Sequence, residues 1–149
     1  MVPKLDMTIC RRRLAALWFA GGLLLFLLVA TQTVLNRYGE RVEEAWAWLL
    51  PAILPTLSLI LGVLIAEQVA TGPMRRLVVD RFFYRLASGL SAVYLLLVAA
   101  TILLSPFSTS PLLEVMRRSN LYLGPLQGLV AAALGVFFVK AVPAGGGRE

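Results

Sequence analysis

Few residues of this chain have side chains that could carry out catalysis. The 149 residues include no histidine and a single cysteine, Cys10, and the lysines, Lys4 and Lys140, lie close to the ends of the sequence. A nucleophilic Ser or Cys needs a nearby His or Lys as its base, and a structural zinc site needs several Cys or His ligands. Because neither set exists here, we expect no catalytic residues, no metal site and no cofactor. The sequence predicts a protein that is not an enzyme.

One carboxylate, Glu67, lies inside an otherwise apolar stretch. A charge at the centre of a membrane-spanning helix costs about 2.5–3.5 kcal/mol and therefore often marks function. Glu67 is near the end of its stretch, within reach of lipid headgroups and of Arg75 and Arg76. Two interpretations stay open: an interfacial carboxylate paired with arginine, which the position favours, and a cation site or proton relay.

Uncharged polar residues form a second group of candidates. The amide of Gln127 cannot stay unpaired in hydrocarbon without a cost of several kcal/mol, so it must face another helix, water or a subunit axis. It forms hydrogen bonds between helices, or it lines a wet vestibule above an apolar gate. The candidate pathway residues are Gln127, Thr56, Ser58 and Gln32.

The composition indicates which elements carry these residues. The chain is 59% hydrophobic and 15% charged, with a mean hydropathy of +0.82, whereas a soluble domain is about 45–50% apolar and about 25% charged. Four stretches are long and apolar enough to cross a bilayer: 14–35, 48–70, 83–105 and 121–139. They do not alternate as barrel strands do. We predict an all-α, polytopic membrane protein with one four-helix transmembrane domain over 1–149, arranged as two hairpins.

The first stretch and the basic residues bear on topology. A basic start followed by an apolar run also describes a signal peptide, but this run exceeds the usual 7–15 residues, so we expect a retained helix. Most of the 14 basic residues lie before the first stretch, between the second and third, or after the fourth. Cytoplasmic segments are enriched in Lys and Arg, which predicts that both termini are cytoplasmic. The net charge of +6 then indicates affinity for the lipid bilayer and not for nucleic acid.

The connections carry two further expectations. Ser110 followed by Pro111 is typical of a helix start, and the apolar residues after it fall on one face. This predicts a short helix in the outer headgroup layer, in the third loop. Its two arginines are a snorkelling pair or a contact with a partner or an anionic lipid. The candidate partner or lipid contacts are Arg117, Arg118, Arg75 and Arg76.

On the inner side, Pro73 suits the first turn of a helix. We expect a helix that begins there to run unbroken into the third span. Residues 141–149, which include three consecutive glycines, are predicted to be a flexible tail.

Small residues recur at helical spacing in the second and fourth stretches. Within lipid, close packing through small residues does much of the work of helix association. The predicted packing residues are Ser58, Gly62 and Ala66 in the second stretch and Gly124, Gly128 and Ala132 in the fourth. They meet within one chain or across a subunit boundary, and the sequence alone leaves both arrangements open.

Two functions from different classes fit these features. The first is a homo-oligomeric channel or membrane-permeabilising subunit, in which the second and fourth helices pack around an axis. The second is an accessory or anchoring subunit of a larger membrane complex, in which the small-residue stripes and the third loop form the docking surface. In both cases the partner is a membrane protein, either another copy or a different chain.

Overall fold

The computed structural model describes residues 4–69, 78–104 and 111–138. Its helices are α1 (Met7–Val34), α2 (Val42–Val69), α3 (Arg81–Leu104) and α4 (Leu112–Phe138). A single 3₁₀ turn, η1 (Gly39–Arg41), precedes α2, and two short strands, β1 (Lys4–Asp6) and β2 (Val78–Asp80), precede α1 and α3. All four helices are long and apolar enough to cross a membrane. The chain is therefore built as a multi-pass membrane protein, as its composition predicts.

The helices start earlier than the predicted spans because polar turns extend them at their N-terminal ends. The arginines that precede the first span are good helix formers, and they lie inside α1. Asp6 ends this extension as the N-cap, since its Oδ1 accepts a hydrogen bond from the Thr8 N–H at 2.9 Å. A hydropathy criterion cannot register such turns.

At the other end of α1, the chain turns through a Schellman motif. Asn36 adopts the left-handed region with φ +54°, which asparagine tolerates better than most residues. The N–H groups of Asn36 and Arg37 donate to the carbonyl oxygens of Thr33 and Gln32, both at 3.0 Å. This pairing satisfies carbonyls that the helix end would otherwise leave open, and it directs the chain into η1 and α2.

The connection before α3 differs from the expectation of an unbroken helix. Val78–Asp80 is a strand that pairs antiparallel with Lys4–Asp6. Asp80 then caps α3, because its Oδ1 accepts a hydrogen bond from the Phe82 N–H at 3.0 Å. The prediction of a helix through these residues is therefore wrong, since strand pairing and a new N-cap compete with it; Pro73 itself lies outside the described residues.

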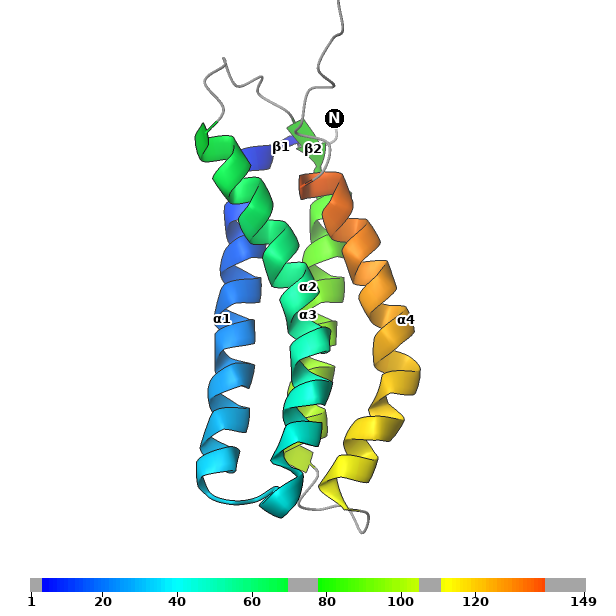
Figure 1. The fold of residues 1–149 in the computed structure, drawn as a ribbon. Helices are drawn as coiled ribbons and strands as arrows, with labels where there is room; N and C mark the ends of the chain where they lie inside the picture. Colours follow the sequence, from blue (N-terminus) through cyan, green and yellow to red (C-terminus); the bar gives the residue numbers. More distant parts are fainter. Residues whose placement is uncertain (1–3, 70–77, 105–110, 139–149) are drawn as a thin grey trace, which may run out of the picture.

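The predicted interfacial segment is helical, but it is not a separate helix. Residues from Leu112 onward form the first turns of α4, which continues to Phe138. The Glu114 and Val115 N–H groups donate to the Pro111 carbonyl, at 2.9 and 3.2 Å, so the first hydrogen bonds of this helix end on Pro111. Pro125, inside α4, bends a helix without ending it, and α4 is visibly curved (Figure 1). Ser110 and residues 141–149 lie outside the described residues.

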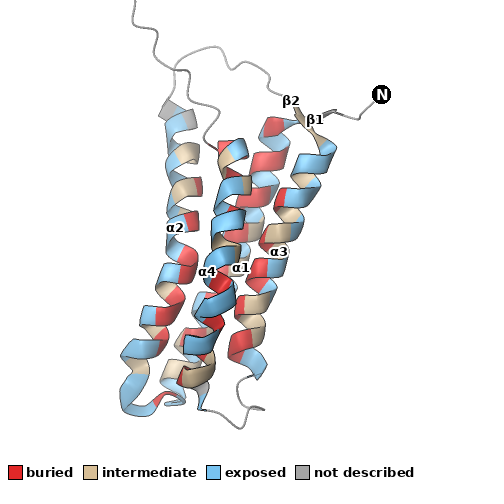
Figure 2. Ribbon diagram, turned by 90° about the vertical axis from the view of Figure 1, so that its right-hand side faces the viewer, coloured by how far each residue is buried: buried red, intermediate tan, exposed pale blue. Residues whose placement is uncertain are grey.

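The four helices form one bundle around an apolar core. α1 and α3 run in one direction, and α2 and α4 run in the other (Figure 1). Each helix turns its buried residues inward and leaves a broad exposed face (Figure 2). The largest fully buried side chains include Trp18, Tyr94, Phe137 and Phe138. The ring centroids of Trp18 and Tyr94 lie 5.8 Å apart, and the two side chains link α1 to α3 at the centre of the bundle.

Candidate functional site

Three side-chain hydrogen bonds from other helices end on two neighbouring carbonyl groups of α2. Pro55 has no N–H, so the carbonyl of Pro51, four residues earlier, has no donor from its own helix. The side-chain Nε2 of Gln127 in α4 donates to that oxygen at 3.0 Å and to the Ala52 oxygen at 3.3 Å. The Tyr94 hydroxyl of α3 donates to the same Ala52 oxygen at 2.8 Å. The carbonyls beside a proline in one helix thus bind side chains from two others.

Gln127 therefore forms hydrogen bonds between helices, which is one of the two roles that the sequence predicts. It lies at the contact between α2 and α4. Its side chain is half-buried, and its amide nitrogen is directed at α2 backbone. In an environment without water, such a bond satisfies both the amide and a carbonyl that the helix leaves open.

The other candidate pathway residues differ in position and exposure. Gln32 accepts a hydrogen bond from the Tyr38 hydroxyl at 2.7 Å, at the far end of α1. Burial raises the pKa of Tyr38 to about 12. Thr56 is buried, whereas Ser58 is exposed on the outside of α2. Among the described residues, Gln32 thus bonds at one end of the bundle, Thr56 is buried, and Ser58 is exposed.

The predicted packing residues all point away from the rest of the chain. Ser58, Gly62 and Ala66 of α2 and Gly124, Gly128 and Ala132 of α4 are exposed; we call these six residues the small-residue face. A Cβ atom added to any of its three glycines would meet no atom within 4 Å. The small-residue face thus does not pack within one chain, and that alternative is wrong. Contact of the face with another chain stays a prediction.

The glycines that do pack between helices are Gly21 and Gly22 of α1. A Cβ added to Gly21 would lie 2.7 Å from Leu95 Cδ1, and one added to Gly22 would lie 3.1 Å from Leu57 Cδ1. Sequence reasoning missed both, although a glycine pair in a leucine-rich run is a signal of close helix approach. They allow α3 and α2 to pack closely against two neighbouring sides of α1.

Arg11 is a buried cation that sequence reasoning counted only as a topology marker. Its side chain is 7% exposed, and its Nε donates a hydrogen bond to the Phe137 carbonyl in the last turn of α4. Carbonyls in a last turn lack helical partners, and a cation there also interacts favourably with the helix dipole. The spacing of Arg11 could have indicated its burial. Arg11, Leu14 and Trp18 share one helical face, and all three are buried.

Arg117 and Arg118 lie at the surface. Arg118 forms an ion pair with Glu114 at 2.9 Å, and Arg117 is exposed beside it. Contact of either arginine with a lipid headgroup or a partner stays a prediction. Arg75, Arg76 and the Glu67 side chain lie outside the described residues.

Within the described ranges, no three His, Cys, Asp or Glu residues lie together as metal ligands would. Comparison of the chain with family models, curated proteins and solved structures finds no match. The arguments for function therefore rest on the geometry of the bundle and its exposed faces.

Proposed function

We propose that this chain is a non-enzymatic subunit of a homo-oligomeric membrane channel, whose copies meet along the small-residue face. The observation that carries the proposal is that the small-residue face is exposed on both helices. Small residues let helix backbones approach closely, and in lipid such packing is a main source of helix association. A second copy would supply the neighbours that these glycines lack.

The conduit in this proposal lies between copies. The interior of one copy is filled by side chains such as Trp18, Tyr94 and Phe137. Ser58 belongs to the small-residue face, and Gln127 lies beside it, next to Gly128 in sequence. Of the four predicted pathway residues, Ser58 and Gln127 are the two that could face an axis formed by several copies. Gln32 accepts a hydrogen bond from Tyr38 of the same chain, and Thr56 is buried.

The geometry also favours a second candidate, an accessory or anchoring subunit of a larger membrane complex. Neither Gln32 nor Thr56 belongs to the exposed surface of α2 and α4, and that surface is mostly apolar. Such a surface fits a transmembrane helix of another protein as well as it fits a second copy. The stoichiometry of the native particle separates the two candidates.

The proposal includes a placement in the membrane. Both hairpins, α1–α2 and α3–α4, cross the bilayer, with the chain termini on the cytoplasmic side. The first turns of α4, with Arg117 and Arg118, then lie in the outer headgroup layer. The distribution of basic residues supports this orientation.

Native mass spectrometry of the full chain in mild detergent tests the assembly. We expect a ring of identical copies, and Gly62→Leu and Gly128→Leu should reduce it to monomers of unchanged helical content. Gly89→Leu is the matched control, because Gly89 of α3 is also exposed and a Cβ there also meets nothing within 4 Å. A monomer in the unmodified protein, or assembly that is equally insensitive to all three substitutions, would contradict the proposal.

Ion and solute flux through reconstituted liposomes tests the conduit. Ser58→Leu and Gln127→Leu should both lower flux per assembled particle if these side chains line the pathway. Since Gln127→Leu also removes an internal hydrogen bond, Ser58→Leu is the cleaner of the two variants. Assembled particles without flux would favour the accessory-subunit function.

A further inference from the structure

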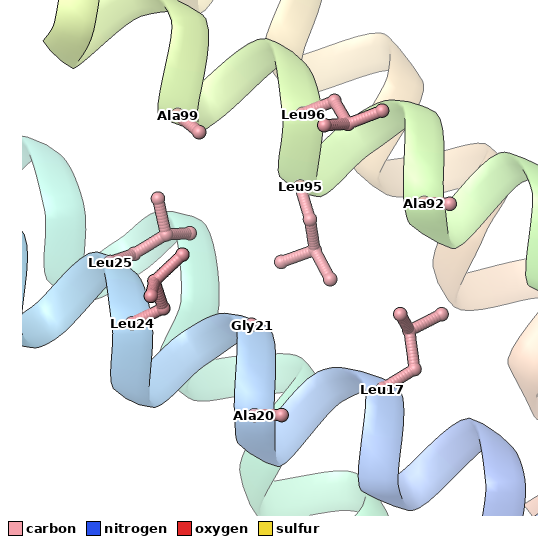
Figure 3. Close-up of a pocket in the computed structure, with 9 residues that line it drawn as sticks. All are labelled: Leu17, Ala20, Gly21, Leu24, Leu25, Ala92, Leu95, Leu96 and Ala99. Atoms are coloured by element: carbon pink, nitrogen blue, oxygen red, sulfur yellow. The ribbon is translucent and has the colours of Figure 1, made fainter.

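An apolar groove runs between α1 and α3 on a surface that the proposed assembly does not use. Nine residues line it, all of them apolar (Figure 3), and it encloses about 340 Å³. Leu25 and Leu95 are the buried residues at its base, and Leu24 and Leu96 are exposed at its edges. Ala20 and Ala92 leave room between the two helices (Figure 3).

The groove has the length of one leaflet. Along α1 its lining extends from Leu17 to Leu25, a rise of about 12 Å at 1.5 Å per residue. One leaflet of the hydrocarbon core is about half of 30 Å deep. A partner helix that crosses the bilayer would need a groove about twice as long, so the dimensions favour an acyl chain.

One end of the groove is cationic. α1 and α3 are parallel and start at the same end, where β1 pairs with β2 (Figure 1). Arg13 lies one turn before Leu17, and Arg85 lies two turns before Ala92, and helical spacing places each arginine on the groove side of its helix. Both side chains are exposed, and in the described part of the chain neither has an ion-pair partner.

We propose that the groove between α1 and α3 binds an acyl chain of an anionic glycerophospholipid, whose phosphate is held by Arg13 and Arg85. The guanidinium groups match the phosphate in charge and in hydrogen-bonding geometry. The apolar walls of the groove match the acyl chain. The phosphate thus meets the arginines at the end of the groove, and the acyl chain meets the apolar walls beyond them.

The headgroup part of the site is tested by lipid binding to the full chain in detergent, measured by native mass spectrometry with phosphatidylglycerol and with phosphatidylcholine of the same acyl chains. We expect one phosphatidylglycerol to be retained per chain and phosphatidylcholine to bind more weakly. Near a membrane surface one arginine is worth about 1 kcal/mol toward an anionic lipid, so Arg13→Gln and Arg85→Gln should each weaken binding about fivefold. Arg12→Gln is the matched control, because Arg12 is exposed but lies on another face of α1.

The groove part of the site is tested with Ala20→Phe, which places a ring where the acyl chain would lie. Ala16→Phe, one turn earlier and also exposed, should leave binding unchanged. Circular dichroism checks that all variants keep their helical content. The proposal would be overturned by equal binding of the two lipids, by equal effects of Arg12→Gln and Arg13→Gln, or by full retention of phosphatidylglycerol in Ala20→Phe. Because lipid is counted per chain, the outcome does not depend on whether the chain forms a channel.

Discussion

The side-chain amide of Gln127 in α4 lies 3.0 Å from the carbonyl oxygen of Pro51 in α2, and Pro55 is the reason that this oxygen is available. A proline inside a helix removes the donor for the carbonyl four residues earlier. In a membrane that carbonyl has no water to bind. Pro55, Pro51 and Gln127 therefore depend on one another. Pro55 leaves the Pro51 carbonyl of α2 without a donor, and the Gln127 side chain of α4 binds that carbonyl.

Gln127→Leu should lower the stability of the bundle by about 1 kcal/mol, because double-mutant cycles in membrane proteins put such bonds at about 0.6 kcal/mol on average, with a maximum near 1.7. Reversible unfolding in mixed micelles, followed by circular dichroism, measures the change. Asn120→Leu is the control on α4, since Asn120 is exposed. Equal effects of the two substitutions would show that the bond to Pro51 contributes nothing specific.

Pro55→Ala tests whether the proline creates the need for Gln127. Alanine restores an N–H to which the Pro51 carbonyl can bind within α2, and Pro55 is exposed, so the change removes no packing. In the Pro55→Ala background, we expect Gln127→Leu to cost less than it does in the native chain. A double-mutant cycle measures this coupling, and a coupling energy near zero would contradict the mechanism.

The sequence predicts the four helices because length and hydropathy are local properties. It does not predict the partner of Gln127, which depends on the proline of another helix. The strand pair is missed for the same reason, since Asp6 and Val78 are partners but lie far apart in sequence. The ends of α1 and α3 are missed because an Asp N-cap acts through a hydrogen bond that a hydropathy window does not register.

Arg11→Met should destabilise the protein by about 2 kcal/mol, because hydrogen bonds to charged groups contribute about 1.5–3 kcal/mol and the Phe137 carbonyl would lose its donor. Methionine keeps a long apolar side chain in the buried site. Arg12→Met is the control: Arg12 is exposed on the same turn, and such surface changes usually stay within about 0.5 kcal/mol. Chemical unfolding in mixed micelles compares the two, and similar midpoints would indicate that Arg11 acts only as a topology charge.

The glycines show a further limit of sequence reasoning. A small residue reveals that a close approach is possible at its position, but its pattern does not reveal what approaches. Gly62 and Gly128 have the clearer spacing and no neighbour in the chain, whereas Gly21 and Gly22 have no such spacing and contact two helices. The difference comes from the rotation of each helix in the bundle, which all the packing contacts set together.

Substitution of single glycines should therefore give opposite results at the two kinds of site. Gly22→Val places a branched side chain where even a Cβ would lie 3.1 Å from Leu57, and overpacking of this kind typically costs about 1–3 kcal/mol. Gly62→Ala meets nothing within the chain, and alanine favours a helix over glycine by up to about 1 kcal/mol. Unfolding of the detergent-solubilised monomer should show Gly22→Val destabilised and Gly62→Ala unchanged or more stable. Destabilisation by Gly62→Ala in a monomer would mean that the second helix turns its small residues inward, and the exposed face on which the proposed assembly depends would not exist.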